Sequence, residues 1–274
     1  MIAVLIIIIG FFTAFIGSIA GIGGGTILVP SLLFLNHFLD SFSWVTPQKI
    51  VGISLIVMVF TGLSSTISYL KSKRIDYKSG VVFLVGSIPG GILGSWLNQF
   101  IEVKPFTLLF GILMIIVSSL FFLRKRETKP QAHRKGSLYV HRSIELDGHT
   151  YHYSIPILLG ALMAFGVGIL SGLFGIGGGS LMVPAMILLF RVPPHIATAT
   201  SMFMIFFMSL LSSTTHILLG HVAWFYTLLF IPGAWVGGTL GAKVNQRMKS
   251  ETIVWTLRIL LILIGIRLIW EGIG

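Results

Sequence analysis

The stretch GIGGGTILVP at residues 21–30 returns as GIGGGSLMVP at residues 175–184. Seven of the ten positions are identical, and the other three hold similar residues. In both copies the glycines follow a long apolar run and precede a short one. Four glycines disfavour a continuous helix, because each glycine in a helix interior costs about 1 kcal/mol relative to alanine. The repeat therefore predicts two related halves, each containing a broken helix.

The composition indicates where these halves reside. Hydrophobic residues make up 55% of the 274 positions and charged residues only 10%, whereas about a quarter of the residues in a soluble domain are charged. Two short apolar blocks, 26–39 and 180–190, directly follow the glycines. Eight others approach the ~20 residues that span a bilayer: 1–20, 50–70, 79–97, 105–123, 154–174, 196–219, 222–242 and 252–270. We therefore expect an all-α integral membrane protein with eight long and two short segments.

Further landmarks recur in the same order in both halves. Pro47 and Ser54 in the first half match Pro194 and Ser201 in the second. Pro89, Gly90 and Gly94 then match Pro232, Gly233 and Gly237. The chain is therefore divided into a first membrane repeat (1–123), a basic linker (124–153) and a second membrane repeat (154–274). Each repeat holds five segments, and an odd number places equivalent loops on opposite faces, so we expect the repeats to be inverted.

The basic residues suggest the orientation. Threading the ten segments places most of the 19 lysines and arginines, including those of the linker, on one face. Lys and Arg concentrate on the cytoplasmic side of membrane proteins. We therefore expect a cytoplasmic linker and both termini outside, and the net charge of +11 reflects this bias rather than nucleic-acid binding.

The linker contains a hairpin signal. Residues 138–146 alternate in polarity and are followed by Asp147-Gly148, a dipeptide typical of two-residue β-turns. In such a hairpin His152 faces Ser143 and lies diagonal to His141. A surface metal site there is conceivable, but a solvated pair is favoured, because no third ligand is clearly placed beside them. We expect no metal and no cofactor.

The glycine breaks are the candidate substrate site. Unwound backbone inside a bilayer is tolerated where it is buried in protein or lines a cavity, and a helix that starts there directs free N–H groups at the break. Discontinuous helices at matching positions of two halves are a pointer to a transporter's binding site. The candidates are Gly23, Gly24, Gly25, Thr26, Gly177, Gly178, Gly179 and Ser180, with the hydroxyls of Ser54, Thr200 and Ser201. The alternative is that GxxxG spacing, as in Gly17, Gly21 and Gly25, serves close helix packing alone.

The ionisable residues narrow the chemistry. All eight Asp and Glu fall in loops, in the linker or at the C-terminus, which disfavours metal-cation transport, carboxylate proton relays and an enzyme. The absence of cysteine removes thiol chemistry. The polar groups left to contact a substrate are hydrogen-bond donors, namely backbone N–H groups, hydroxyls, and His or Arg side chains. Such donors suit an anion. His216 and His221 fall near the outer end of a segment, where interfacial histidines are ordinary; with Arg258 they are candidates for coupling or gating.

The duplicated GIGGG motifs, the Pro-Gly-x-x-x-Gly elements and the basic linker resemble the TauE/SafE sulfite exporter family, also called the TSUP permeases. The resemblance spans essentially the whole chain. It implies transport of small sulfur-containing anions such as sulfite, thiosulfate or organosulfonates across the bacterial cytoplasmic membrane, often outward. A passive anion channel and a membrane assembly factor are the alternatives. Proton or sodium coupling and a homodimer are left open.

Overall fold

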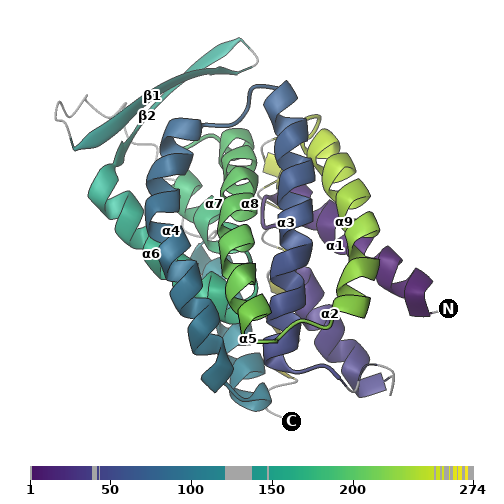
Figure 1. The fold of residues 1–274 in the computed structure, drawn as a ribbon. Coiled ribbons are helices and arrows are strands. Elements are labelled where there is room, and N and C mark those ends of the chain that lie inside the picture. Colours follow the sequence, from purple (N-terminus) through teal and green to yellow (C-terminus); the bar gives the residue numbers. More distant parts are fainter. Residues whose placement is uncertain are drawn as a thin grey trace.

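The computed structural model describes residues 2–38, 42, 44–120, 138–146 and 148–249, with scattered positions between 251 and 270. The first half contributes α1 (Ile2–Ala20), α2 (Gly25–Phe38), α3 (Pro47–Lys71), α4 (Tyr77–Leu97), a 3₁₀ turn (Asn98–Phe100) and α5 (Val103–Leu120) (Figure 1). The second contributes α6 (Ile157–Phe174), α7 (Gly179–Leu188), α8 (Pro194–Leu218) and α9 (Trp224–Asn245). The described positions from 251 to 270 that are assigned are helical. The fold is therefore mainly α-helical, as expected.

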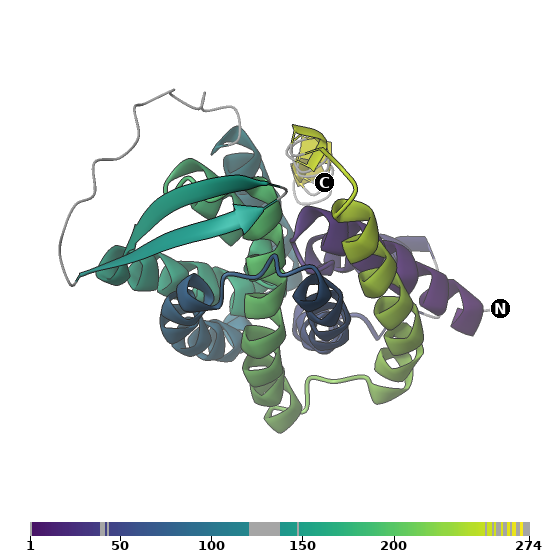
Figure 2. The same ribbon diagram turned by 90° about the horizontal axis from the view of Figure 1, so that it is seen from above.

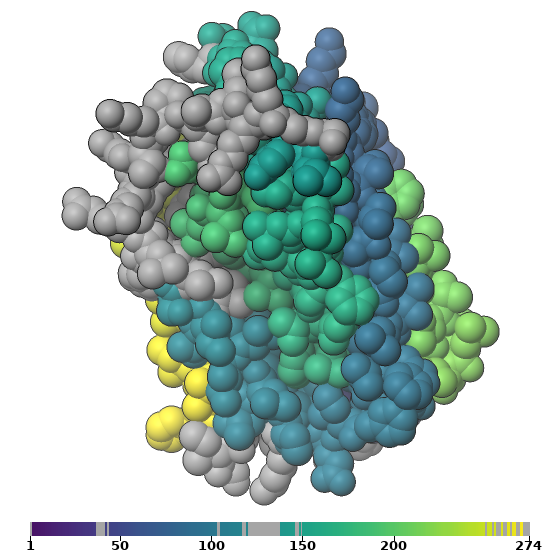
Figure 3. Space-filling model, turned by 90° about the vertical axis from the view of Figure 1, so that its left-hand side faces the viewer, coloured from purple at the N-terminus to yellow at the C-terminus, as the bar shows by residue number. Residues whose placement is uncertain are grey.

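Within the part of the chain that the structure describes, six helices are long and apolar enough to cross a membrane, judged by length and composition: α1, α3, α4, α6, α8 and α9. The helices that follow the glycine breaks, α2 and α7, are shorter, as predicted. Helix α5 is 18 residues long, and residues 121–123 of the predicted segment lie outside the described residues. Apolar side chains of α6 such as Leu158 and Leu162 are exposed, and Figure 3 shows the side of the molecule on which α6 lies at the surface. These features are those of a multi-pass membrane protein.

Helices of the two halves pack against each other: α1 lies along α9, α4 lies along α6, and α3 and α8 contact each other. Helix α3 also packs on α9, and α4 on α8. Glycines make the approaches of α1 to α9 and of α4 to α6 close, because a residue without a side chain lets the backbones touch. On α4 these are Gly86, Gly90 and Gly94, which face the carbonyls of Ala161, Phe165 and Ile169. On α9 they are Gly233, Gly237 and Gly241, which face the carbonyls of Ile7, Phe11 and Phe15.

These contacts correct one match between the halves. The sequence aligns Pro89-Gly90 with Pro232-Gly233, whereas the contacts place Gly90 in the role of Gly237. The difference is one helical turn. Glycine recurs at every fourth position in both helices, so a shift by one turn still matches glycine with glycine, and the packing on α1 and α6 is needed to choose between the registers.

The predicted hairpin is present as β1 (Tyr139–Leu146) and β2 (His149–Pro156), an antiparallel pair across one end of the bundle (Figures 1 and 2). Ser143 faces His152, as predicted. His141 Nδ1 lies 2.9 Å from Ser154 Oγ, and no group of three metal-binding side chains occurs within the part of the chain that the structure describes. The side of the membrane that the hairpin faces stays a prediction.

A buried carboxylate anchors the hairpin to the bundle. Asp76 is the N-cap of α4 and accepts hydrogen bonds from the backbone N–H and the hydroxyl of Ser79. Arg142 Nε of β1 and the Tyr153 hydroxyl of β2 each lie 2.7 Å from an oxygen of this carboxylate. Burial and the neighbouring Asp76 charge raise the pKa of Tyr153 above its usual value, so Tyr153 is a stable donor. Asp76 thus lies outside the apolar spans, as the sequence predicts, but it is only 1% exposed.

Candidate functional site

The chain leaves helical geometry at both GIGGG stretches. At the first, Gly21, Gly23 and Gly24 have φ values of 73°, 81° and 89°. At the second, Gly175, Gly177 and Gly178 have φ values of 67°, 69° and 69°. Glycine adopts this left-handed region readily, whereas other L-residues do so at a cost. The predicted helix breaks are therefore confirmed, and their backbone requires glycine.

Each break is held by a serine from the other half. Ser54 of α3 donates its hydroxyl to the Gly175 carbonyl at 2.6 Å. Ser201 of α8 donates to the Gly21 carbonyl at 2.7 Å. Both serines thus face the breaks as predicted, but their protons bond to backbone oxygen rather than pointing at open space. The two bonds are reciprocal, because a serine of each half bonds to the break of the other half; together they are called the serine clamps.

The helix starts also meet the opposite break. A side chain at Gly25, the first residue of α2, would run into the Gly175 carbonyl. A side chain at Gly179, the first residue of α7, would run into the Gly21 carbonyl. The two breaks therefore lie against each other in the middle of the bundle, between α3 and α8.

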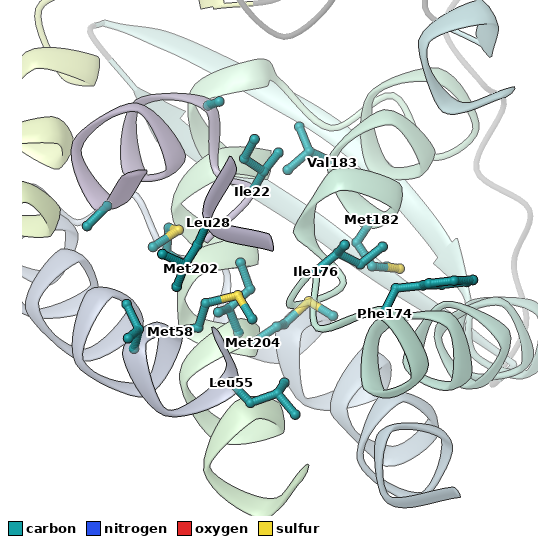
Figure 4. Close-up of a cluster of buried hydrophobic side chains, with 14 of the residues drawn as sticks. Ile22, Leu28, Leu55, Met58, Phe174, Ile176, Met182, Val183, Met202 and Met204 are labelled. Atoms are coloured by element: carbon teal, nitrogen blue, oxygen red, sulfur yellow. The ribbon is translucent and has the colours of Figure 1, made fainter. Parts of the chain in front are cut away.

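Apolar side chains close the space between the breaks. Met58 of α3 and Ile205 of α8 both lie beside Gly23 and Gly177. Ile22 and Ile176, the apolar members of the two motifs, belong to the same buried cluster (Figure 4). Sequence reasoning missed Met58 and Ile205, although each follows the clamping serine by four residues, which is one helical turn.

A pair of asparagines secures the helices that precede the breaks. Asn98, after α4, donates from its side-chain nitrogen to the Leu173 carbonyl at 2.8 Å. Asn245, at the end of α9, donates to the Ile19 carbonyl at 2.6 Å. Both asparagines are completely buried. The sequence carries a signal for this pair, because each asparagine follows a glycine, Gly94 or Gly241, by four residues.

The hydroxyls next to the breaks are available for a ligand. Thr26 and Ser180, at matching positions in the first turns of α2 and α7, are completely buried. Neither hydroxyl has a hydrogen-bond partner among the described residues. The first N–H groups of a helix also have no partner within the helix. Thr200 lies elsewhere, because its hydroxyl accepts the backbone N–H of Asp76 near the hairpin.

A small cavity adjoins the second break. Only about 10 Å³ is open to the centre of a water-sized sphere, which is about the space of one water molecule. Its lining is Ser87, Val167, Gly177, Gly178, Gly179, Met182, Ser201, Met204, Ile205 and Met208. The site is therefore closed, and it must widen to take an anion of several atoms.

The histidine candidates lie in the last turn of α8 and in the loop that follows it. His216 of α8 is completely buried against α3, with its Cβ close to Gly52. His216 lies in the last turn of α8, near the end of the segment as the sequence indicates, but α3 covers its side chain. Its ring lies 5.6 Å from that of His221, centroid to centroid, and burial lowers the pKa of His221. Arg258 lies outside the described residues.

Comparison with known proteins gives a consistent result. A family model described as "Sulfite exporter TauE/SafE" matches residues 6–268. The "Probable membrane transporter protein YunE" of Bacillus subtilis is 48% identical over 271 residues, covering 98% of both chains. A "Probable membrane transporter protein" of Xylella fastidiosa is 30% identical over 91% of this chain and 88% of its own. The "Sulfite exporter TauE/SafE family protein 6" of Arabidopsis thaliana is 27% identical over 68% of this chain and 41% of its own. No solved structure matches.

Proposed function

The chain belongs to the TauE/SafE sulfite exporter family, and from this premise we propose that it is a secondary transporter of small sulfur-containing anions. Sulfite, thiosulfate and organosulfonates are the substrates considered, with export as the direction. The observation that carries the proposal is the meeting of two broken helices at the centre of a membrane bundle. Each brings a buried, unpartnered hydroxyl, Thr26 or Ser180, to the break.

The chemistry of this centre suits an anion. Helix N-termini carry partial positive charge and offer free N–H donors, and the hydroxyls add further donors. Binding rests on dipoles and hydrogen bonds, because no charged side chain is among the described residues that line the cavity at the second break. The buried carboxylate of Asp76 bonds to the hairpin and to Ser79. A cation would meet no counter-charge at the breaks within the residues that the structure describes.

Inverted repeats over 1–123 and 154–274 are part of the proposal. The pairs α1 with α9 and α4 with α6 support it, because exchanging the halves turns one pair into the other. So do the reciprocal serine and asparagine bonds. The proposed location is the bacterial inner membrane, as the family implies. The proposed orientation places the basic linker in the cytoplasm and both termini outside.

Alternating access is the proposed mechanism. The centre is closed, with room for about one water molecule, so an anion can enter only after the halves move relative to each other. The serine clamps and the apolar pair Met58 and Ile205 are the contacts that such a movement must loosen. Coupling to protons or sodium, with a role for His216, His221 or Arg258, is a proposal that flux measurements test. The homodimer is a separate proposal, tested by the mass of the protein in detergent.

The direct test is uptake of radiolabelled sulfite and thiosulfate into proteoliposomes, with sulfate and chloride as comparison ions. The Gly178→Leu variant is measured beside the wild type, after checking that both insert equally. Saturable flux that the variant abolishes supports the transporter. Non-saturable flux indicates a passive channel. Absence of flux for all four anions rules out sulfite and thiosulfate as substrates, and absence of flux for an organosulfonate such as methanesulfonate as well contradicts the proposal and favours an assembly role. Repeating the assay with imposed proton or sodium gradients identifies the coupling ion.

A further inference from the structure

The cavity beside the second break contains a donor that sequence reasoning did not select. Ser87 of α4 lines the cavity together with Gly177, Gly178 and Gly179. Its side chain is 1% exposed, and its hydroxyl has no hydrogen-bond partner among the described residues. A buried hydroxyl without a partner is costly, about 1–3 kcal/mol. Such a group, facing the first turn of α7, points to a ligand that completes its hydrogen bonds.

The cavity is also uncharged. Its lining holds glycines, two serines and apolar side chains, and none of its members is a lysine, arginine, histidine or acidic residue. The polar groups offered to a ligand are the Ser87 hydroxyl and the N–H groups at the start of α7, which begins after Gly178. The other serine, Ser201, already donates to Gly21. An anion here would be held by neutral dipoles.

Neutral dipoles discriminate between anions by charge. The cost of removing an ion from water rises with the square of its charge in the Born treatment, whereas its attraction to fixed dipoles rises only in proportion to the charge. Doubling the charge therefore quadruples the penalty and doubles the gain. Without a cationic side chain to make up the difference, the site favours a singly charged anion.

We propose that the second break binds singly charged sulfur oxyanions, hydrogensulfite or an alkanesulfonate, with Ser87 and the first N–H groups of α7 as donors. The proposal rests on the transport function proposed above and narrows its substrate class. Thiosulfate and sulfate, which are doubly charged, are excluded as good substrates.

The lining explains how the closed cavity can widen. Three of its members are methionines, Met182, Met204 and Met208, whose unbranched side chains adapt to irregular spaces. The Cε atom of Met208 lies 3.3 Å from the position that a Cβ atom on Gly178 would take. A change of methionine rotamers therefore opens space next to the α7 N-terminus without moving the helix backbone.

The test compares anions of fixed and of variable charge in proteoliposomes. Methanesulfonate is singly charged at every pH used, sulfate is doubly charged, and sulfite changes from the singly to the doubly charged form near neutrality. We expect saturable methanesulfonate flux, and its value at each pH between 6 and 8.5 is the reference that removes any pH dependence of the transporter itself. At a fixed total concentration, sulfite flux should fall over this range in step with the hydrogensulfite fraction, and sulfate and thiosulfate flux should be negligible.

Ser87→Ala should raise the half-saturating concentration of methanesulfonate about tenfold to a hundredfold, the value of one lost hydrogen bond to a charged ligand. Ser209→Ala is the matched control, since Ser209 is also buried with an unpartnered hydroxyl but does not line the cavity. Sulfate or thiosulfate flux equal to that of methanesulfonate overturns the charge selectivity and leaves the transporter standing. An unchanged half-saturating concentration in Ser87→Ala overturns the role of Ser87. Absence of flux for every anion overturns the transport function itself.

Discussion

The two glycine breaks share a sequence and a backbone geometry but differ in what surrounds them. At the first break, Gly24 is wedged against α1, where an added Cβ atom would lie 2.7 Å from the Thr13 carbonyl oxygen. At the second, Gly178 faces the side chains of Met208 and Val167, each at 3.3 Å or more, and a small cavity adjoins it. Duplication thus preserves the break, while the packing decides which copy has room for a ligand.

Substituting the glycines at the helix starts should have the largest effect, and it should be equal in both halves. In Gly25→Ala and Gly179→Ala the new methyl group runs into a backbone carbonyl of the opposite half, which a rotamer change cannot relieve. We expect loss of more than about 4 kcal/mol of stability, as for severe overpacking with backbone strain. Thermal unfolding in detergent measures this. A wild-type melting temperature for either variant would contradict the contact between the breaks.

Gly24→Ala and Gly178→Ala should separate the two breaks. Both force a left-handed conformation on alanine, at about 1–2 kcal/mol. Gly24→Ala adds a clash with the α1 backbone, so its total loss should reach about 3–5 kcal/mol. Gly178→Ala should keep the fold and reduce anion flux instead. Equal melting temperatures for the two variants would show that the difference in packing has no consequence.

The starts of α4 and α9 offer a second contrast. Asp76 caps α4 and bonds to the hairpin, whereas Ala223 in the matching position before α9 provides no side-chain cap. Removing a partner of a buried charge is destabilising. Arg142 is partly exposed, so we expect Arg142→Gln to cost about 1–3 kcal/mol.

The readout for Arg142→Gln is faster hydrogen exchange in residues 139–156, with the exchange of α9 unchanged. Glu145→Gln is the control, because Glu145 lies on the same strand with its side chain exposed. Unchanged exchange in Arg142→Gln would mean that the bond to Asp76 does not hold the hairpin in place.

The serine clamps should give the smallest and most symmetrical effect. Ser54→Ala and Ser201→Ala each remove one hydrogen bond to a buried glycine carbonyl, at about 1–2 kcal/mol. Their melting temperatures should fall by the same amount. A fall confined to one variant would sharpen the comparison by showing that only one of the clamps contributes to the closed state.

Local patterns in the sequence predicted the breaks, the short helices after them and the pairing of Ser143 with His152, because glycine content and turn residues act over a few positions. Features that depend on helix crossings were missed. The α4 and α9 register was shifted by a turn because repeated glycines match at either register. Periodicity does not reveal contacts between residues that are distant in sequence. Such contacts determine the burial of His216, the placement of Thr200 near Asp76, and the positions of the donors Ser87, Asn98 and Asn245.

The most direct measurement uses the absence of cysteine from the chain. Ser87→Cys introduces a single thiol at the second break, and its reaction with a membrane-impermeant thiol reagent can be followed from each side of proteoliposomes. The account predicts reaction from both sides, slowed by methanesulfonate, which does not react with thiol reagents, in proportion to occupancy. Reaction rates that methanesulfonate does not change, in a variant that still transports it, would contradict the claim that the break is the anion site.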